Sequence, residues 1–351
     1  MIDWIIAERI AAFVAGEGED RGPTIDLAPL AAESEARVVA YTGLRPARPL
    51  PPPEGIGRRE WVTSNIGSMR ALLDPVLVRA GENLGPLRPA VQIGVGLVLS
   101  TEVGVVLGYL AQRVLGQYEL VLLDEAVENR PPRLLFVLPN LGQVVRSFDA
   151  DEREFMTWVT LHEVTHAVQF AGVPWLHAHV AGLVRELLAS AEVRIEAPRK
   201  LRVPSREEVG EIMAALRKGD LISIVTNKAE RETLDRVQAV MAVIEGHAEH
   251  VMDAVAPDLV PSLPRLRAGI DRRRRSQSGL SRLLARLLGM DLKLRQYEQG
   301  KRFCDAVVAD SGVEALHHVF SGPEALPTLA ELNDPAAWLK RTAGARTAAA
   351  A

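Results

Sequence analysis

The sequence has 351 residues and a single cysteine, Cys304. One cysteine cannot form a disulfide within the chain, and it cannot provide the several thiolates of a cysteine-ligated metal cluster. Both classes are therefore excluded for the single chain. Because disulfides are rare where thiols are kept reduced, this composition also predicts a cytoplasmic protein.

Long hydrophobic runs are missing as well. In the most apolar region, the uncharged run between Arg88 and Glu102 has 13 residues, whereas a helix needs about 20 apolar residues to cross a bilayer. The apolar N-terminus has Asp3 where a secretory signal has basic residues, and Glu8 and Arg9 interrupt it. We therefore expect neither a membrane span nor a signal peptide.

An excess of one charge is also absent. The net charge of −4 gives no general attraction to nucleic acid or anionic lipid. The basic run 272–275, RRRR, has no stacking aromatic residue beside it, so we interpret it as a solvated helix end rather than a nucleic-acid contact. The "GVG" at 94–96 lacks the third glycine of a dinucleotide-binding turn. We instead expect a buried helix pair in this apolar region, in which glycines allow the two helices to approach closely. These glycines are Gly94, Gly96, Gly104 and Gly108.

The remaining pattern predicts a mainly α fold with a small β-hairpin or short sheet. The segments 118–124 (YELVLLD) and 133–140 (RLLFVLPN) are short, apolar and bounded by turn-forming residues, so we expect two strands that pair as a hairpin. Most other segments have helical spacing. We assign a helix at 2–15, a proline-rich connector at 44–57, helical regions at 61–115, 149–172, 177–196 and 227–255, and two later helices with a break near 276–279. As domains, we expect an N-terminal helix and connector at 1–56, a single domain at 57–342 and a disordered tail at 343–351.

The helix that directly follows the second strand contains the sequence HEVTH. Asp149 with Glu152 forms a capping-box start for it. His162 and His166 are four residues apart, so their imidazoles lie one above the other on the same face. Glu163 can reach a water held by the same ion. Two neutral nitrogen ligands, an open coordination position and a carboxylate base are what zinc hydrolysis requires.

The alternative is that the two histidines are core residues. Phe155 and Val159 share their face, so the helix belongs in the interior, where two stacked imidazoles need hydrogen-bond partners. Carboxylates would then hold them without a metal. A metzincin arrangement is excluded, because positions 169 and 172 carry Gln169 and Gly172 instead of glycine and histidine.

A catalytic zinc usually has three protein ligands. On the helix 238–253, one stripe contains Gln238, Met241, Glu245, Glu249 and Met252. We assign Glu245 as the third ligand and Glu249 as the carboxylate that orients a ligand histidine. The reverse assignment stays open. Gly246 would permit close approach of another helix.

Other histidines give further alternatives. His177 and His179, just beyond the HEVTH helix, could bend back to the metal, and we retain His179 as the alternative ligand. His247 points about 160° away from Glu245 on their shared helix, so we do not expect it to be a co-ligand. The candidate donors to a developing oxyanion are Arg295, Tyr297, His250, His317 and His318.

Three segments, LHEVTHAVQFAGVPWL, VIEGHAEHVMD and LGMDLKLRQYEQG, resemble the zincin-like hydrolase family, including its branch named for association with deazaflavin-coenzyme biosynthesis. The resemblance extends from about Trp61 to Trp338. It implies a mostly helical zincin-like fold, His162 and His166 as zinc ligands, Glu163 as catalytic acid and base, and Glu245 as third ligand. It does not imply a particular substrate.

The sequence hypothesis is therefore a zinc metallopeptidase that acts on a peptide or protein. A strand at 133–139 would offer an edge to which an extended peptide adds. Two alternatives remain. The first is a non-catalytic scaffold whose zinc is coordinately closed, for example by Glu245 and His179. The second is a partner protein linked to the deazaflavin coenzyme, for which the sequence shows no phosphate-binding loop.

Overall fold

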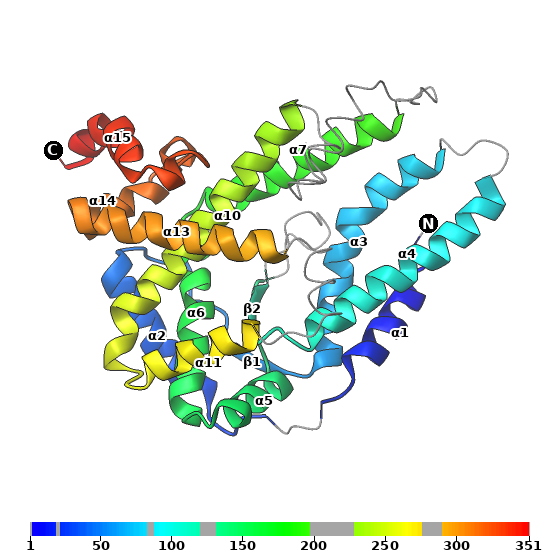
Figure 1. Ribbon diagram of the computed structural model, residues 1–351, viewed down its shortest axis with the longest axis horizontal. Helices are drawn as coiled ribbons and strands as arrows, with labels where there is room; N and C mark the ends of the chain where they lie inside the picture. The colour runs from blue at the N-terminus through cyan, green and yellow to red at the C-terminus, as the bar shows by residue number, and fades with distance from the viewer. Residues whose placement is uncertain are drawn as a thin grey trace.

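The computed structural model describes residues 2–18, 22–82, 88–119, 131–196, 228–275 and 290–350. It is mainly helical with one small sheet, which confirms the predicted fold class (Figure 1). The strands are β1 (Pro53–Ile56), β2 (Gly116–Glu119) and β3 (Arg133–Val137). The helices are α1 (Trp4–Ala15), α2 (Leu27–Thr42), α3 (Arg58–Glu82), α4 (Arg88–Ala111), α5 (Leu138–Phe148), α6 (Glu152–Gly172), α7 (Leu176–Glu196), α10 (Lys228–Val255), α11 (Leu263–Arg275), α13 (Met290–Ser311), α14 (Val313–His317) and α15 (Pro335–Ala350).

The sheet has the order β1-β3-β2. β2 pairs antiparallel with β3, with Gln117 opposite Leu135, so the predicted hairpin partners are confirmed. The described part of the first strand is Gly116–Glu119, and residues 120–130 lie outside the description. β1 pairs parallel with the other side of β3. The expectation that the strand at 133–139 offers a free edge is therefore wrong, because β3 is central; in the described sheet, β2 and β1 are the edges.

The first 56 residues form more than a helix and a connector. α2 was not predicted; Asp26 caps its start by accepting from the N–H of Ala28, and Gly43 ends it in the left-handed region at φ 67°. β1 lies inside the proline-rich segment, where Pro53 is tolerated as the first residue of an edge strand. α1 packs on α4, α2 packs on α6 and β1 pairs with β3, so all three elements join the later chain.

Two glycines of α4, Gly104 and Gly108, contact α1. A Cβ on Gly104 would lie 2.7 Å from the carbonyl oxygen of Ala7, and one on Gly108 would lie 2.6 Å from that of Ala11. Only glycine permits this approach, as predicted for a buried helix pair. Gly94 is different, because a Cβ there would have nothing within 4 Å. Within the described residues, no helix is long and apolar enough to span a bilayer.

α6 lies at the centre of the main core. Phe155, Met156 and Leu161 are fully buried on it, and α10 contributes Val251 and Met252 to the same cluster. On its other side, α10 packs against α13 through Gly246 and Gly300, where a Cβ on either residue would collide with backbone of the other helix. The prediction that Gly246 allows a close helix contact is confirmed. These contacts fix α10 between α6 and α13.

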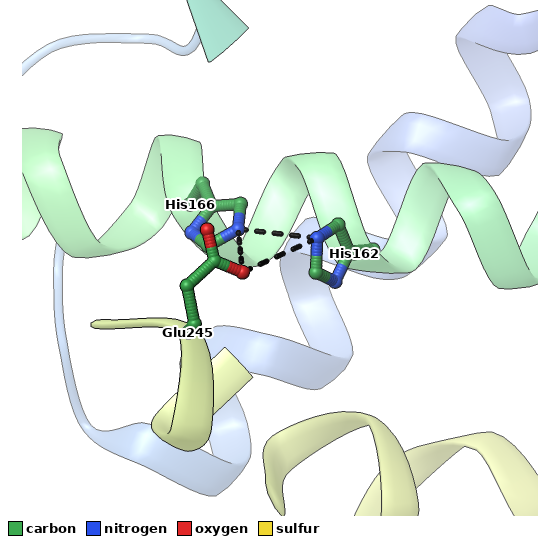
Figure 2. A group of neighbouring side chains, drawn as sticks. All are labelled: His162, His166 and Glu245. Carbon is green, nitrogen blue, oxygen red and sulfur yellow. Dashed lines mark hydrogen bonds and ion pairs between the residues drawn. The ribbon is translucent and has the colours of Figure 1, made fainter. Parts of the chain in front are cut away.

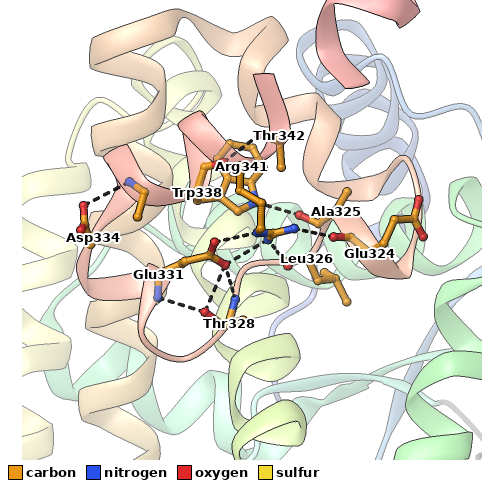
Figure 3. A network of polar contacts seen from close by, with 10 residues as sticks. Glu324, Ala325, Leu326, Thr328, Glu331, Asp334, Trp338, Arg341 and Thr342 are labelled. Carbon is orange, nitrogen blue, oxygen red and sulfur yellow. Dashed lines mark hydrogen bonds and ion pairs between the residues drawn. The ribbon is translucent and has the colours of Figure 1, made fainter. Parts of the chain in front are cut away.

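A hydrogen-bond network around Arg341 ties α15 to the segment 324–331 (Figure 3). Its guanidinium donates to both carboxylate oxygens of Glu331 and to the carbonyls of Glu324 and Leu326. The indole of Trp338 donates to the carbonyl of Ala325 at 2.7 Å. α15 continues to Ala350, into the segment that we expected to be disordered from residue 343; its alanines are strong helix formers.

Candidate metal centre

The helix that carries HEVTH begins two residues later than predicted. The N-cap is Asp151, whose carboxylate accepts from the N–H of Glu154 at 2.9 Å. Asp149 instead ends α5, in a left-handed conformation with φ 48°. α6 has 21 residues and carries His162, Glu163 and His166 on its third and fourth turns.

Two helices distant in sequence bring three side chains together (Figure 2). His162 and His166 point from α6, and Glu245 points from α10. The two Nε2 atoms are 3.2 Å apart. Oε2 of Glu245 lies 3.9 Å from Nε2 of His162 and 3.6 Å from Nε2 of His166. Among the histidines, cysteines, aspartates and glutamates that the structure describes, these three residues form a group that could hold a metal ion. Their ligand atoms all lie within 4.8 Å of one another.

The spacing of these atoms fits a zinc ion. A circle through atoms 3.2, 3.6 and 3.9 Å apart has a radius of about 2.1 Å. Zinc lies about 2.0–2.1 Å from histidine nitrogen and about 2.0–2.2 Å from carboxylate oxygen. The three atoms can therefore hold one cation almost without rearrangement, and two imidazoles with one carboxylate are a donor set that suits zinc.

Glu163 lies beside this group, against strand β2. A Cβ on Gly116 would lie 2.6 Å from Cγ of Glu163 and 2.9 Å from its carboxylate, so only glycine lets the strand approach so closely. The backbone N–H of Tyr118 donates to the Glu163 carboxylate. Burial raises the pKa of Glu163 to about 7; His166 opposes this rise, Glu245 adds to it and the Tyr118 N–H opposes it.

The pKa of His166 is also raised, to about 9. Burial alone would lower it, but the carboxylate of Glu245, then that of Glu163, and the bond to Gln169 favour the protonated ring more strongly. Two carboxylates that face two imidazoles thus attract positive charge to the point where the side chains meet. A proton or a metal ion can provide it.

The far side of each imidazole contacts a different kind of group. Nδ1 of His166 lies 2.9 Å from Oε1 of Gln169, whose Nε2 lies 2.9 Å from both the carbonyl of Ile244 and Nδ1 of His247. Nδ1 of His162 lies 3.2 Å from the sulfur of Met252. The sequence interpretation missed Gln169; its only signal was a polar amide three residues after His166 on an apolar helix.

Glu249 lies one turn beyond Glu245 and is half-buried. Glu245, not Glu249, joins the two histidines, which favours the first of the two assignments. The orienting role of Glu249 stays a prediction. His247 is buried with its ring edge against Phe320, and it reaches the centre only through Gln169.

The other candidates are placed elsewhere or lie outside the description. His179 packs its ring edge against Trp175 and is not part of the three-residue group, so the structure does not support it as alternative ligand. His250 lies between the hydroxyl of Tyr41 and the carboxylate of Asp305. α13 carries Arg295 and Tyr297, but their side chains lie outside the described residues.

Comparisons with known proteins identify the family of the chain. Among curated proteins, none matches the sequence. A crystal structure from Chloroflexus aurantiacus, of "a putative hydrolase with a novel fold", is similar with a TM-score of 0.71 and 31% sequence identity, over 97% of this chain and 99% of that one. The profile of a family described as zincin-like metallopeptidases matches residues 2–339. The chain therefore belongs to the zincin-like metallopeptidase family.

Proposed function

We propose that the protein is a zinc-dependent metallopeptidase in which His162, His166 and Glu245 hold the metal. The observation that carries the proposal is the convergence of two imidazole nitrogens and one carboxylate oxygen, 3.2–3.9 Å apart, from two separate helices. Family membership and the similarity to a hydrolase structure support the same reaction class.

The number of ligands favours a catalytic role over a structural one. Structural zinc sites have four protein ligands, whereas catalytic sites have three and keep one position for water or substrate. Among the described residues, the group has three members. When bound there, zinc would polarise a carbonyl group and lower the pKa of a water molecule to about 7.

Glu163 is the residue suited to move the proton. Its carboxylate adjoins the metal ligands, beside the position that a zinc-bound water would take, and a carboxylate placed there can accept a proton and release it again. We assign it as the base that deprotonates the attacking water and the acid that protonates the leaving amine. The contacts with Gly116 and the Tyr118 N–H hold the carboxylate in one place.

A peptide is the proposed substrate class. In the part of the sheet that the structure describes, β2 is an edge strand, and it passes next to Glu163. The backbone N–H of Val137 donates to the carbonyl of Leu115, so in this antiparallel ladder Gly116 and Tyr118 direct their backbone groups away from β3. The N–H of Tyr118 already donates to Glu163, so an extended peptide would pair with the other outward backbone groups of this edge, close to the base.

The test uses metal analysis and a peptide-library digest. We expect about one zinc per chain in freshly purified protein, and hydrolysis of some library members. Glu163→Gln should retain the zinc and lose activity by about 10²–10⁴-fold, the usual contribution of a general base. Glu314→Gln, at a side chain that is 90% exposed, is the matched control and should resemble the wild type. Full activity in Glu163→Gln would reject the assigned role.

A further inference from the structure

We propose that Gln169 is a positioning residue of the metal centre, which fixes the tautomer of His166 and ties the helix of the histidines to the backbone next to Glu245. The proposal rests on the metal site proposed above. The geometry assigns this role to a neutral amide on the same helix as the histidines.

The orientation of the Gln169 amide follows from one backbone group. The carbonyl oxygen of Ile244 can only accept a hydrogen bond, so the side-chain atom 2.9 Å from it must be the NH₂ group of Gln169. The amide oxygen therefore faces the other way, toward Nδ1 of His166 at 2.9 Å. An amide oxygen can only accept, and Nδ1 of His166 must then carry the proton.

This fixes the metal-facing side of His166. A neutral imidazole with its proton on Nδ1 has a free lone pair on Nε2. That nitrogen faces Nε2 of His162 and the carboxylate of Glu245. The other neutral tautomer would present an N–H to the cation and could not coordinate it. Gln169 thus selects the form of His166 that can bind metal.

The same amide links the two helices that supply the ligands. Ile244 directly precedes Glu245, so the bond from Gln169 holds α10 to α6 at the point where the third ligand leaves the helix. Nδ1 of His247, three residues after Ile244 on α10, provides a second acceptor for the NH₂ group of Gln169. On its far side α10 is fixed by the Gly246–Gly300 contact. Glu245 is therefore held from both sides.

The burial of Gln169 explains why an amide suits this position. The side chain of Gln169 is fully buried. The carboxylates of Glu163 and Glu245 already act on His166, the ring that Gln169 contacts. A third buried negative charge would need a further compensating cation. A carboxylate could also not donate to the carbonyl of Ile244. The amide provides both an acceptor and a donor without charge.

The experiment measures the zinc affinity of the full-length chain by competition with a chromophoric chelator. The variants are Gln169→Met, which keeps the length but loses both hydrogen bonds, and Gln169→Asn, whose amide is too short to reach both partners. Loss of such a partner usually weakens metal binding about 10–100-fold, and we expect this loss in both variants. Gln143→Met, at an exposed glutamine of α5, is the control and should bind zinc as the wild type does.

A second readout separates positioning from general stability. Cobalt bound in place of zinc has a visible spectrum that depends on ligand geometry. We expect this spectrum to change in both Gln169 variants and to stay the same in Gln143→Met. A merely structural role would lower the unfolding temperature without altering the affinity or the cobalt spectrum of the folded variants, and that result would overturn the proposal.

The outcomes also distinguish this proposal from the proposed function. If wild-type protein binds zinc tightly and either Gln169 variant binds it equally tightly, only the positioning role fails. If the wild type binds no zinc, both proposals fail. If Gln169→Met does not fold, Gln169→Asn, which keeps the polarity of the site, decides the matter.

Discussion

Two polar clusters of the molecule, both partly exposed, differ in where their positive charge comes from. In the C-terminal cluster, the Arg341 guanidinium lies among its acceptors, with Nε 2.7 Å from one oxygen of Glu331 and Nη2 3.0 Å from the other. In the centre between α6 and α10, the atoms that face one another are two imidazole nitrogens and a carboxylate oxygen. With neutral imidazoles oriented for coordination, all three are acceptors.

The first cluster contains its own cation, whereas the second has the donor atoms that the proposed zinc would need from outside the chain. Buried acceptors that face each other are costly unless a proton or metal ion lies between them. The pKa of His166 is raised to about 9 because the carboxylates of Glu245 and Glu163 outweigh the effect of burial, which is the same attraction for positive charge. The proposed zinc ion would fit the 3.2–3.9 Å spacing of the three atoms better than a shared proton would.

The largest expected effect comes from removal of a metal ligand. His166→Ala should reduce the zinc content from about one per chain to none, because only one imidazole and one carboxylate remain. Elemental analysis after gel filtration measures this directly. Arg341→Met should keep its zinc, since its cluster needs no metal. Equal zinc content in His166→Ala and wild type would show that His166 does not hold the metal, and the contrast between the two clusters would then fail.

Displacement of the base should have the next largest effect. The methyl group of Gly116→Ala would collide with Glu163 and push its carboxylate away. A shift of about 1 Å can reduce turnover by about 10²-fold, and we expect a loss of that order with unchanged zinc content. Gly67→Ala is the control, because a Cβ there meets nothing within 4 Å. Unchanged turnover in Gly116→Ala would show that the strand does not position Glu163.

Removal of the internal cation should affect stability alone. Arg341→Met leaves two carbonyls without the Arg341 donor and the Glu331 carboxylate with the donors of Thr328 alone. Because the Arg341 side chain is 40% exposed, water screens part of the loss, and we expect roughly 1–2 kcal/mol less free energy of unfolding. Denaturant titration measures this. A drop in zinc affinity in this variant would show that the two clusters are coupled.

The smallest expected effect is a pH dependence of the C-terminal cluster. Burial tends to raise the pKa of Glu331, but the bonds from Arg341 and Thr328 outweigh it and lower the pKa. A depressed folded-state pKa contributes stability that is present above the unfolded value of about 4.3 and is lost as the pH falls through the folded value. Glu331→Gln should therefore have a flatter stability profile below pH 5 than wild type. Parallel profiles would contradict this assignment.

Local patterns predicted much of the centre. The spacing of His162 and His166 depends only on the helical period, and the assignment of Glu245 followed from a helical stripe that also holds Glu249, with the reverse assignment left open. Gln169 could not be identified, because its role depends on Ile244, which is distant in sequence. β1 was missed for the same reason, since its parallel pairing with β3 joins segments far apart. The cap at Asp151 instead of Asp149 reflects a choice between two nearby aspartates that only the packed chain makes.

The most direct test of the central claim is a crystal structure of the zinc-loaded protein with data collected at the zinc absorption edge. Our account predicts one anomalous peak between His162, His166 and Glu245, about 2.0–2.2 Å from each ligand atom. A zinc-saturated crystal without a peak there, or with the peak on other side chains, would contradict it.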